Sequence, residues 1–219
     1  MNYTALSNAI QAYTENTEAD FVANIPVFVT QAEQRIFNSV QFPSLRQNVT
    51  GVTTTNNKYL QCPTDFLAVY SLAIINASGE YEYLLNKDVH FIRQAYPQPT
   101  DTGIPRYYAL FGPRSDNAAE LTFILGPTPD AAYGAELHYF FYPPSITVSP
   151  YTSWLGDNFD PVLLYGSLVE AYTYMKGEAD MMALYNGKYQ EALALAKRLG
   201  DGMERQDAYR SGQYRQAVT

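Results

Sequence analysis

The 219-residue sequence has few of the side chains on which metal and redox chemistry depend, with one cysteine and two histidines. A single cysteine, Cys62, excludes an internal disulfide and a cysteine-based metal cluster, and we expect it to be a small buried residue. His90 and His138 are not part of a His-Glu-x-x-His motif. The sequence therefore predicts neither a metal ion nor any other cofactor.

Sequence features of membrane proteins and of common enzymes are also missing. No run approaches about 18 apolar residues and no positive segment precedes an apolar one at the start, so we expect a soluble, unexported protein without a membrane partner. The glycine-rich loops that hold nucleotide phosphates and the Gly-x-Ser-x-Gly elbow are absent. Ser167 follows Gly166 in an apolar segment, where its hydroxyl should face packing or a backbone carbonyl. We predict that the protein is not an enzyme.

Charge is scarce and unbalanced, whereas tyrosine is abundant. Only 16% of the residues are charged and the net charge is −8, which does not favour binding to DNA phosphates. The chain has 20 Tyr and 11 Phe. Tyrosine offers a large contact area with few rotamers to fix, so it is enriched at interfaces. A tyrosine-rich β core would explain the same composition equally well.

The first 45 residues have the apolar periodicity of α-helices. One predicted helix contains Tyr3, Leu6, Ile10 and Tyr13 at helical spacing. Thr17 is a candidate cap for a second helix, and Pro26 is expected to start another because proline fits the first turn. An apolar stripe then continues to Val40.

The pattern of residues 46–147 is that of strands. Asn56-Asn57 resembles a turn, a β-rich apolar run covers 66–75, and a short helix covers about 86–96. Further strands are predicted at the following ranges: 81–85, 106–111, 120–125 and 134–142. We expect these strands to form an antiparallel β domain.

The helical period returns after residue 147. Asp160-Pro161 opens a helix in which Gly166 would permit close helix approach. A second helix is expected over 179–199, with Leu199 in its packing stripe and a stop at Gly200-Asp201-Gly202. Asp157 lies near Trp154, a grouping that could bind sugar, but Asp157 or Asn158 as a helix cap explains these residues more simply.

Together these patterns predict an α+β fold. The N- and C-terminal helices form a helical bundle, with an inserted antiparallel β domain and an extended C-terminal arm. The predicted divisions are 1–45, 46–147, 148–202 and 203–219.

Residues 203–219 are polar and contain a five-residue quasi-repeat of Arg and Tyr. On an α-helix a five-residue step does not keep these side chains on one face. The segment is either a frayed terminus or an arm that orders on a partner, with Tyr as anchors and Arg as carboxylate-binding forks. The candidate partner-binding residues are Arg205, Tyr209, Arg210, Tyr214 and Arg215.

Eight short segments, weak singly, occur in an order that resembles the head-to-tail adaptor, or connector, proteins of tailed bacteriophages. They span roughly residues 20–200: Asn24–Pro26, Ala32–Ile36, Pro63–Phe66, Gly103–Leu110, Leu125–Pro129, Tyr139–Pro144, Trp154–Leu155 and Leu164–Ala171. The resemblance implies a structural virion protein at the head-tail junction, assembled in the host cytoplasm. It further implies a ring of 12 copies that joins the portal protein to the tail nozzle or another tail protein, with genomic DNA passing through its channel.

Three alternatives stay open. Another tail component, such as a tail completion, nozzle or baseplate subunit, would differ in its partner. A carbohydrate-binding tail protein could use tyrosine-rich loops and Trp154 to stack on sugars. A DNA-binding packaging factor is disfavoured by the acidic charge.

Overall fold

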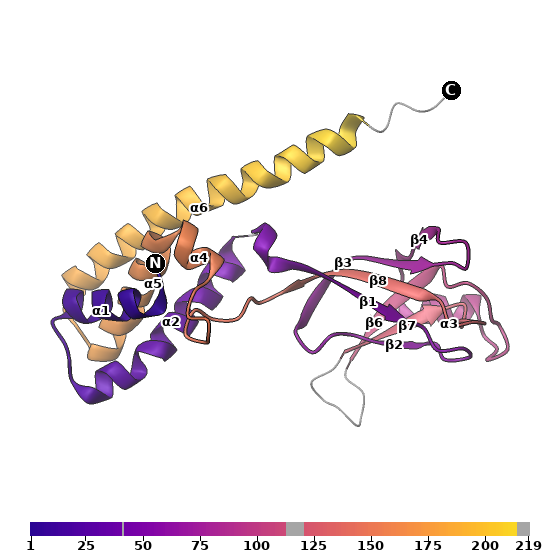
Figure 1. The fold of residues 1–219 in the computed structure, drawn as a ribbon, viewed down its shortest axis with the longest axis horizontal. Coiled ribbons are helices and arrows are strands. Elements are labelled where there is room, and N and C mark those ends of the chain that lie inside the picture. Colours follow the sequence, from indigo (N-terminus) through magenta and orange to yellow (C-terminus); the bar gives the residue numbers. More distant parts are fainter. Residues whose placement is uncertain (41, 113–120, 214–219) are drawn as a thin grey trace. The chain divides into compact units, whose positions relative to one another are not determined.

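The computed structural model describes residues 1–40, 42–112 and 121–213, with side chains as far as Gly200 in the last helix. The chain divides into two compact units, one formed by Met1–Leu45 with Tyr142–Thr219 and the other by Arg46–Phe141. The described residues contain six α-helices and two four-stranded sheets (Figure 1). The protein is therefore α+β. None of the helices in the described ranges is long and apolar enough to span a membrane.

The first unit is helical, and its longest helices surround α5. Its helices are α1 (Tyr3–Thr14), α2 (Ala19–Ser39), α4 (Trp154–Asn158), α5 (Asp160–Met175) and α6 (Ala179–Gln213). α5 packs against α1, α2, α4 and α6. As predicted, it starts at Asp160-Pro161, where proline occupies the first turn.

Gly166 is the point of closest approach in this unit. A Cβ at this position would lie 3.2 Å from the Tyr189 ring of α6 and 3.3 Å from the Ala32 Cβ of α2. The predicted role of this glycine is confirmed. One turn further along α5, Glu170 forms an ion pair with Arg35 of α2. Apolar packing at Gly166 thus joins α2, α5 and α6, and the ion pair adds a second link between α2 and α5.

The N-terminal helices differ from the prediction at Pro26. α2 begins at Ala19, Thr17 is not its cap, and Pro26 lies inside the helix rather than at the start of a new one. Phe21 and Ile25 are buried ahead of the proline and Phe28 after it. Because the buried face is continuous, its packing outweighs the lost backbone hydrogen bond.

The predicted stop of the last helix is also wrong. α6 continues through Gly200-Asp201-Gly202 to Gln213 (Figure 1). Each glycine costs about 1 kcal/mol in a helix interior, but extending an existing helix needs no new nucleation. Six of residues 203–213 are Gln, Arg, Glu or Ala, which favour a helix even without an apolar stripe.

The predicted caps before α5 are wrong as well. Ser153 caps α4 by accepting a hydrogen bond from the Gly156 N–H at 3.0 Å. The residue before α5 is Phe159, which makes no side-chain cap. Asn158 instead donates to the Trp154 carbonyl, and the rings of Trp154, Phe42 and Phe159 pack against one another. Trp154 is therefore part of an aromatic cluster in the helical unit.

The second unit consists of two sheets. Its elements are β1 (Arg46–Val52), β2 (Tyr59–Gln61), β3 (Phe66–Ile75), β4 (Tyr81–Tyr83), β5 (Leu85–Asn86), α3 (Val89–Ala95), β6 (Tyr107–Phe111), β7 (Thr122–Gly126) and β8 (Gly134–Phe141). Sheet A has the order β1-β8-β3-β4 and sheet B the order β2-β7-β6-β5. All pairings are antiparallel except that of β5 with β6.

The core of this unit lies between the two sheets. Leu72 and Leu137 of sheet A pack with Phe123 and Leu125 of sheet B, and Cys62 is buried among them as predicted. On the outer face of sheet B, Ile124 packs against Ile92 of α3. α3 therefore covers part of sheet B, while the outer face of sheet A lies on the opposite side of the sandwich.

Residues 142–147 lie with the helices. The Tyr142 hydroxyl donates to the Asn38 side chain at 2.5 Å, and its ring stacks near Phe37. Ile146 is fully buried, and its N–H donates to Glu33 at 3.0 Å. This carboxyl is itself buried, and desolvation raises its pKa despite the opposing hydrogen bonds from Ser145 and Ile146.

Candidate interaction surfaces

The predicted arm residues lie on or beyond the end of α6. Arg205, Tyr209 and Arg210 belong to the helix, although their side chains are not among those described. Tyr214 and Arg215 lie outside the described residues. The predicted arm is thus helical as far as Gln213.

α6 also presents apolar side chains that the helical unit does not use. Leu193 and Ala196 are buried against the unit, as predicted, but Leu199 is exposed and does not continue that stripe. Leu195 and Leu199 are 59% and 43% exposed, and their four-residue spacing places them on one face. A helix with a second, unburied apolar stripe is typical of one that packs against a further partner.

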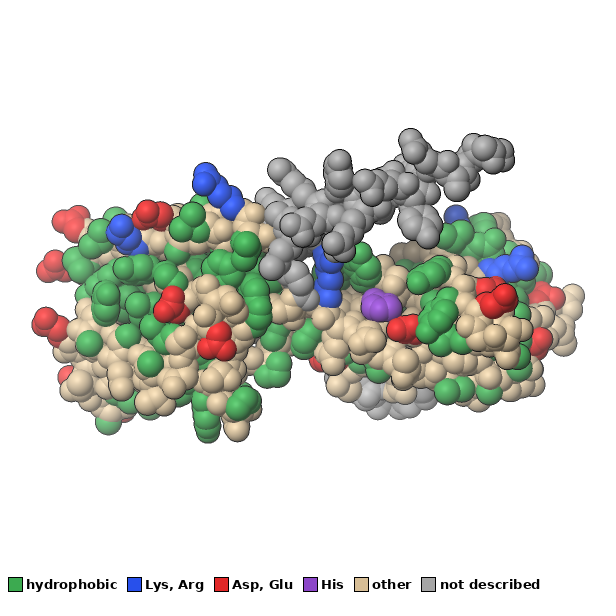
Figure 2. Space-filling view, turned by 45° about the horizontal axis from the view of Figure 1, so that its top comes forward, with side chains coloured by type: hydrophobic (Ala, Val, Ile, Leu, Met, Phe, Trp, Pro, Cys, Tyr) green, Lys and Arg blue, Asp and Glu red, His purple; other side chains and the backbone are tan. Residues whose placement is uncertain are grey.

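The outer face of sheet A carries a second surface, made of aromatic rings. The guanidinium carbon of Arg46 lies 4.9 Å from the ring centre of Tyr70 and 5.5 Å from that of Phe140. Tyr70 is 57% exposed. Hydrophobic side chains gather with a histidine and acidic groups on one face of the sheet-containing unit in Figure 2. Rigid, half-exposed aromatic groups of this kind are common contacts in protein interfaces.

A row of polar groups crosses the same face from β3 to β4. The Ser71 hydroxyl lies 3.3 Å from Nδ1 of His138, whose Nε2 lies 3.8 Å from Glu136. The Glu136 carboxylate, through its charge and as a hydrogen-bond partner, raises the pKa of Tyr81. His138 is therefore one member of a polar row. Within the described ranges, no three His, Cys, Asp or Glu side chains gather as metal ligands would.

We call the end of this row the carboxylate edge, defined as Glu80, Tyr81, Glu82, Tyr83 and Glu136. β4 is the outermost strand of sheet A, so one side of its backbone has no neighbouring strand in the described structure. Tyr81 and Tyr83 are 53% and 66% exposed. The edge combines exposed rings, carboxylates and backbone groups that are free to pair.

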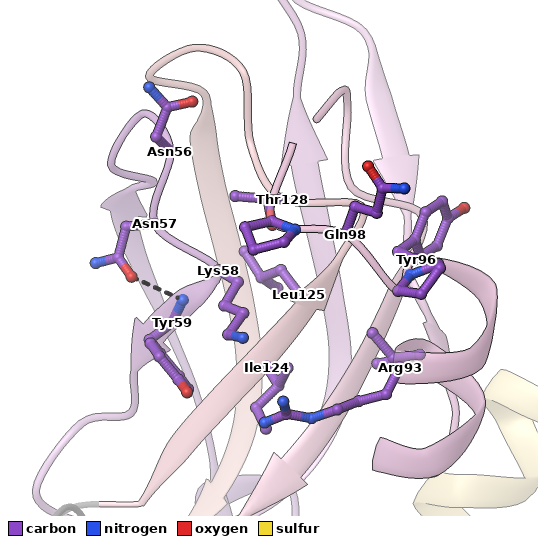
Figure 3. Close-up of a pocket in the computed structure, with 13 residues that line it drawn as sticks. Asn56, Asn57, Lys58, Tyr59, Arg93, Tyr96, Gln98, Ile124, Leu125 and Thr128 are labelled. Carbon is purple, nitrogen blue, oxygen red and sulfur yellow. Dashed lines mark hydrogen bonds between the residues drawn. The ribbon is translucent and has the colours of Figure 1, made fainter. Parts of the chain in front are cut away.

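A pocket opens on the opposite side of the unit, beside α3 (Figure 3). Its volume is about 280 Å³, and we call it the basic pocket. Its floor includes Ile92, Ile124 and Leu125, which are buried. The side chains of Lys58 and Arg93 extend from opposite walls toward Ile124 (Figure 3).

The walls of the basic pocket are fixed by local backbone structure. Asn56 adopts a left-handed conformation with φ of 62°, as the predicted turn requires, and the Asn57 side chain accepts from the Tyr59 N–H at 3.1 Å. Lys58 is held to sheet B because its carbonyl accepts from the Leu125 N–H at 2.8 Å. The facing wall contains Pro97 and Pro99, which restrict the chain after α3.

The basic pocket has positive charge without a lining carboxylate. Lys58 and Arg93 are its charged lining residues. The nearby Asp101 is engaged in the chain itself, where its carboxylate accepts from the Gln98 N–H at 3.0 Å. In a chain of net charge −8, this is a local site that would attract a carboxylate. The sequence did not reveal it, because its walls come from segments far apart in the chain.

The most nucleophilic side-chain types in the described core are held in inert positions. Burial raises the pKa of Cys62 to about 12, so its thiol stays protonated near neutral pH. The Ser167 hydroxyl is fully buried and donates to the Leu163 carbonyl at 2.8 Å, as predicted. Cys62 and Ser167 therefore act as packing residues in the described core.

Several of the segments that resemble head-to-tail adaptors contact one another in the structure. The Tyr139 hydroxyl donates to Asp65 at 3.0 Å, and burial together with this carboxylate raises the pKa of Tyr139 to about 12. Ala32 approaches Gly166, and Arg35 pairs with Glu170. These residues therefore help to build the two units.

The fold and its surfaces define a class: an α+β protein in two units, with an inserted two-sheet unit, a long terminal helix and exposed aromatic and charged contact surfaces. The family model described as SU10 adaptor protein matches residues 1–216 of the chain. The chain therefore belongs to the SU10 adaptor protein family, a family of phage head-to-tail adaptors. No curated protein matches it.

Proposed function

We propose that this protein is a non-enzymatic structural subunit of the phage virion, and that its copies form a ring that joins the portal protein to the tail. The observation that carries the proposal is the family match over residues 1–216. The copy number of twelve comes from the resemblance to head-to-tail adaptors. Assembly in the host cytoplasm and incorporation at the head-tail junction follow from the same role.

Charge supports a channel through which genomic DNA can pass. The chain has 22 Asp and Glu but 14 Lys and Arg. A lining poor in cations releases few counterions from DNA and so does not hold the phosphate backbone. Exposed tyrosines support the ring, because rigid rings make strong contacts between subunits.

We propose α6 as the docking arm for the portal. The helix has 35 residues and is about 50 Å long at about 1.5 Å per residue. The exposed Leu195 and Leu199 would pack against the portal, while Arg205, Tyr209 and Arg210, followed by Tyr214 and Arg215, would provide carboxylate-binding and aromatic contacts. The tail nozzle or another tail protein would contact the opposite side of the ring.

The buried states of Cys62 and Ser167 support the non-enzymatic part of the proposal. A thiol with a pKa of about 12 is a poor nucleophile near neutral pH. A serine hydroxyl that donates to the carbonyl of its own helix is not oriented by a general base.

The direct test is to mix the purified protein with its cognate portal and to image the product by electron microscopy. We expect a ring of subunits below the portal, with the C-terminal helix against it. No complex, together with localisation at a tail tip or baseplate in whole particles, would replace the adaptor role with that of another tail component. Binding of the purified chain to a glycan array would instead favour a carbohydrate-binding tail protein.

A further inference from the structure

The basic pocket and the carboxylate edge lie on opposite sides of the two-sheet unit. The pocket lies on the outer side of sheet B next to α3. Tyr81 and Tyr83 pair with Ile75 and Ala73 on the outer face of sheet A. Two different surfaces on opposite sides of one unit permit a head-to-tail contact, in which each copy uses its pocket on one neighbour and its edge on the other.

We propose that the basic pocket of one copy binds the carboxylate edge of the next. This inference rests on the proposed ring and names a contact within it. Lys58 and Arg93 would pair with carboxylates of the edge, while an exposed tyrosine of β4 would pack over the buried floor formed by Ile92 and Ile124.

Charge complementarity selects a second copy of this chain as the occupant. The pocket has two cations and no lining carboxylate. The edge has Glu82 on β4, Glu80 directly before this strand, and Glu136 on β8, which is separated from β4 by β3. Tyr81 and Tyr83 of β4 remain more than half exposed, and one side of the β4 backbone has no neighbouring strand in the described structure. A contact between the two surfaces would bury both sets of groups together and compensate their charges.

The first test is zero-length cross-linking with a carbodiimide, which joins an amine to a carboxylate only where the two are in contact. Isotopically labelled and unlabelled full-length chains are mixed, both free in solution and bound to the portal. A cross-linked pair of one labelled and one unlabelled peptide then identifies a link between two copies. We expect Lys58 to be linked between copies to Glu80, Glu82 or Glu136. Inter-copy links of Lys58 to other carboxylates, or none at all, would overturn the contact.

The second test exchanges the charges. K58E/R93E reverses the pocket and E80K/E82K reverses the edge, and each variant alone should associate more than tenfold more weakly because like charges then face each other. Mixing the two variants in equal amounts should restore association, since each reversed surface meets its complement on the other variant. The control K188E/K197E makes the same change in net charge on α6 and should leave self-association unchanged.

Different results would contradict the adaptor role and the contact between the basic pocket and the carboxylate edge. A ring below the portal without the Lys58 links, or without rescue in the mixture, would leave the adaptor role intact and overturn the contact. A decrease in association for K188E/K197E equal to that for K58E/R93E would show that overall charge alone controls assembly, which also overturns the contact. Absence of any portal complex from the wild-type protein would instead count against the adaptor role.

Discussion

The substitution Tyr189→Phe should stabilise the helical unit. The Tyr189 side chain is 1% exposed, and its hydroxyl has no hydrogen-bond partner in the described structure. A buried hydroxyl without a partner costs about 1–3 kcal/mol, whereas phenylalanine keeps the ring that packs against Gly166 and near Arg35. Taking the lower end of this range, we expect a gain of about 1 kcal/mol, or about 2–4 °C in Tm for a chain of this size.

Tyr185→Phe is a matched control one turn earlier on the same helix. The side chain of Tyr185 is also buried, but its hydroxyl interacts with Tyr172, and burial followed by this interaction raises its pKa to about 12. Removing this hydroxyl should cost about 1 kcal/mol, since its interaction with the Tyr172 hydroxyl is lost. The same chemical change should therefore have opposite signs at the two positions.

Urea unfolding followed by circular dichroism at about 222 nm measures both variants. The signal comes mainly from the helical unit, because α3 is the only described α-helix outside it. The midpoint should rise for Tyr189→Phe and fall for Tyr185→Phe with a similar slope. Equal destabilisation by both substitutions would mean that the Tyr189 hydroxyl has a partner and that the reasoning is wrong.

Three further predictions concern a carboxyl, a thiol and the arm. Burial raises the pKa of Glu33, so its ionisation costs stability as the pH rises through the folded value; Glu33→Gln should stabilise the protein at about pH 7 but not at about pH 3.5, as measured by urea unfolding. Cys62 should react with iodoacetamide about a thousandfold more slowly in the folded protein than in urea, as judged by mass spectrometry. Deletion of residues 203–219 should abolish portal binding while circular dichroism shows retained helix, because the described core ends before them; retained binding would place docking elsewhere.

Local sequence signals predicted the elements that are set by short-range physics. The apolar run of β3 matches its predicted range, and α5 begins where Asp160-Pro161 favours a first turn. The small residue at Gly166 and the hydroxyl of Ser167 behave as their positions on an apolar helix face indicate. Each of these outcomes depends on neighbouring residues and on one buried face.

The sequence predictions are wrong where tertiary packing outweighs a local helix-breaking or helix-capping signal. Pro26 lies inside α2 because residues on both sides share one buried face. Gly200 is itself buried, on the face that includes Ala196, so it is a packing position rather than a stop. Asn158 did not cap α5, since its side chain bonds backward to the Trp154 carbonyl.

The contact surfaces could not be predicted from single segments. Lys58 directly precedes β2, Arg93 lies on α3, and the floor residue Ile124 lies on β7. Likewise, the row from Ser71 to Tyr81 depends on the register of β3, β8 and β4. Only the three-dimensional pairing of strands reveals that these side chains are neighbours.

The chain enters and leaves the sheet-containing unit through paired strands. Arg46 at the start of β1 lies opposite Phe140 near the end of β8, so entry and exit are adjacent. A segment whose two ends meet in this way can be exchanged or redesigned as a cassette without changing the length of the connections to its host. Evolution could thus vary the pocket and the edge of this unit while the helices, with their buried Gly166 and Glu33, keep one sequence pattern.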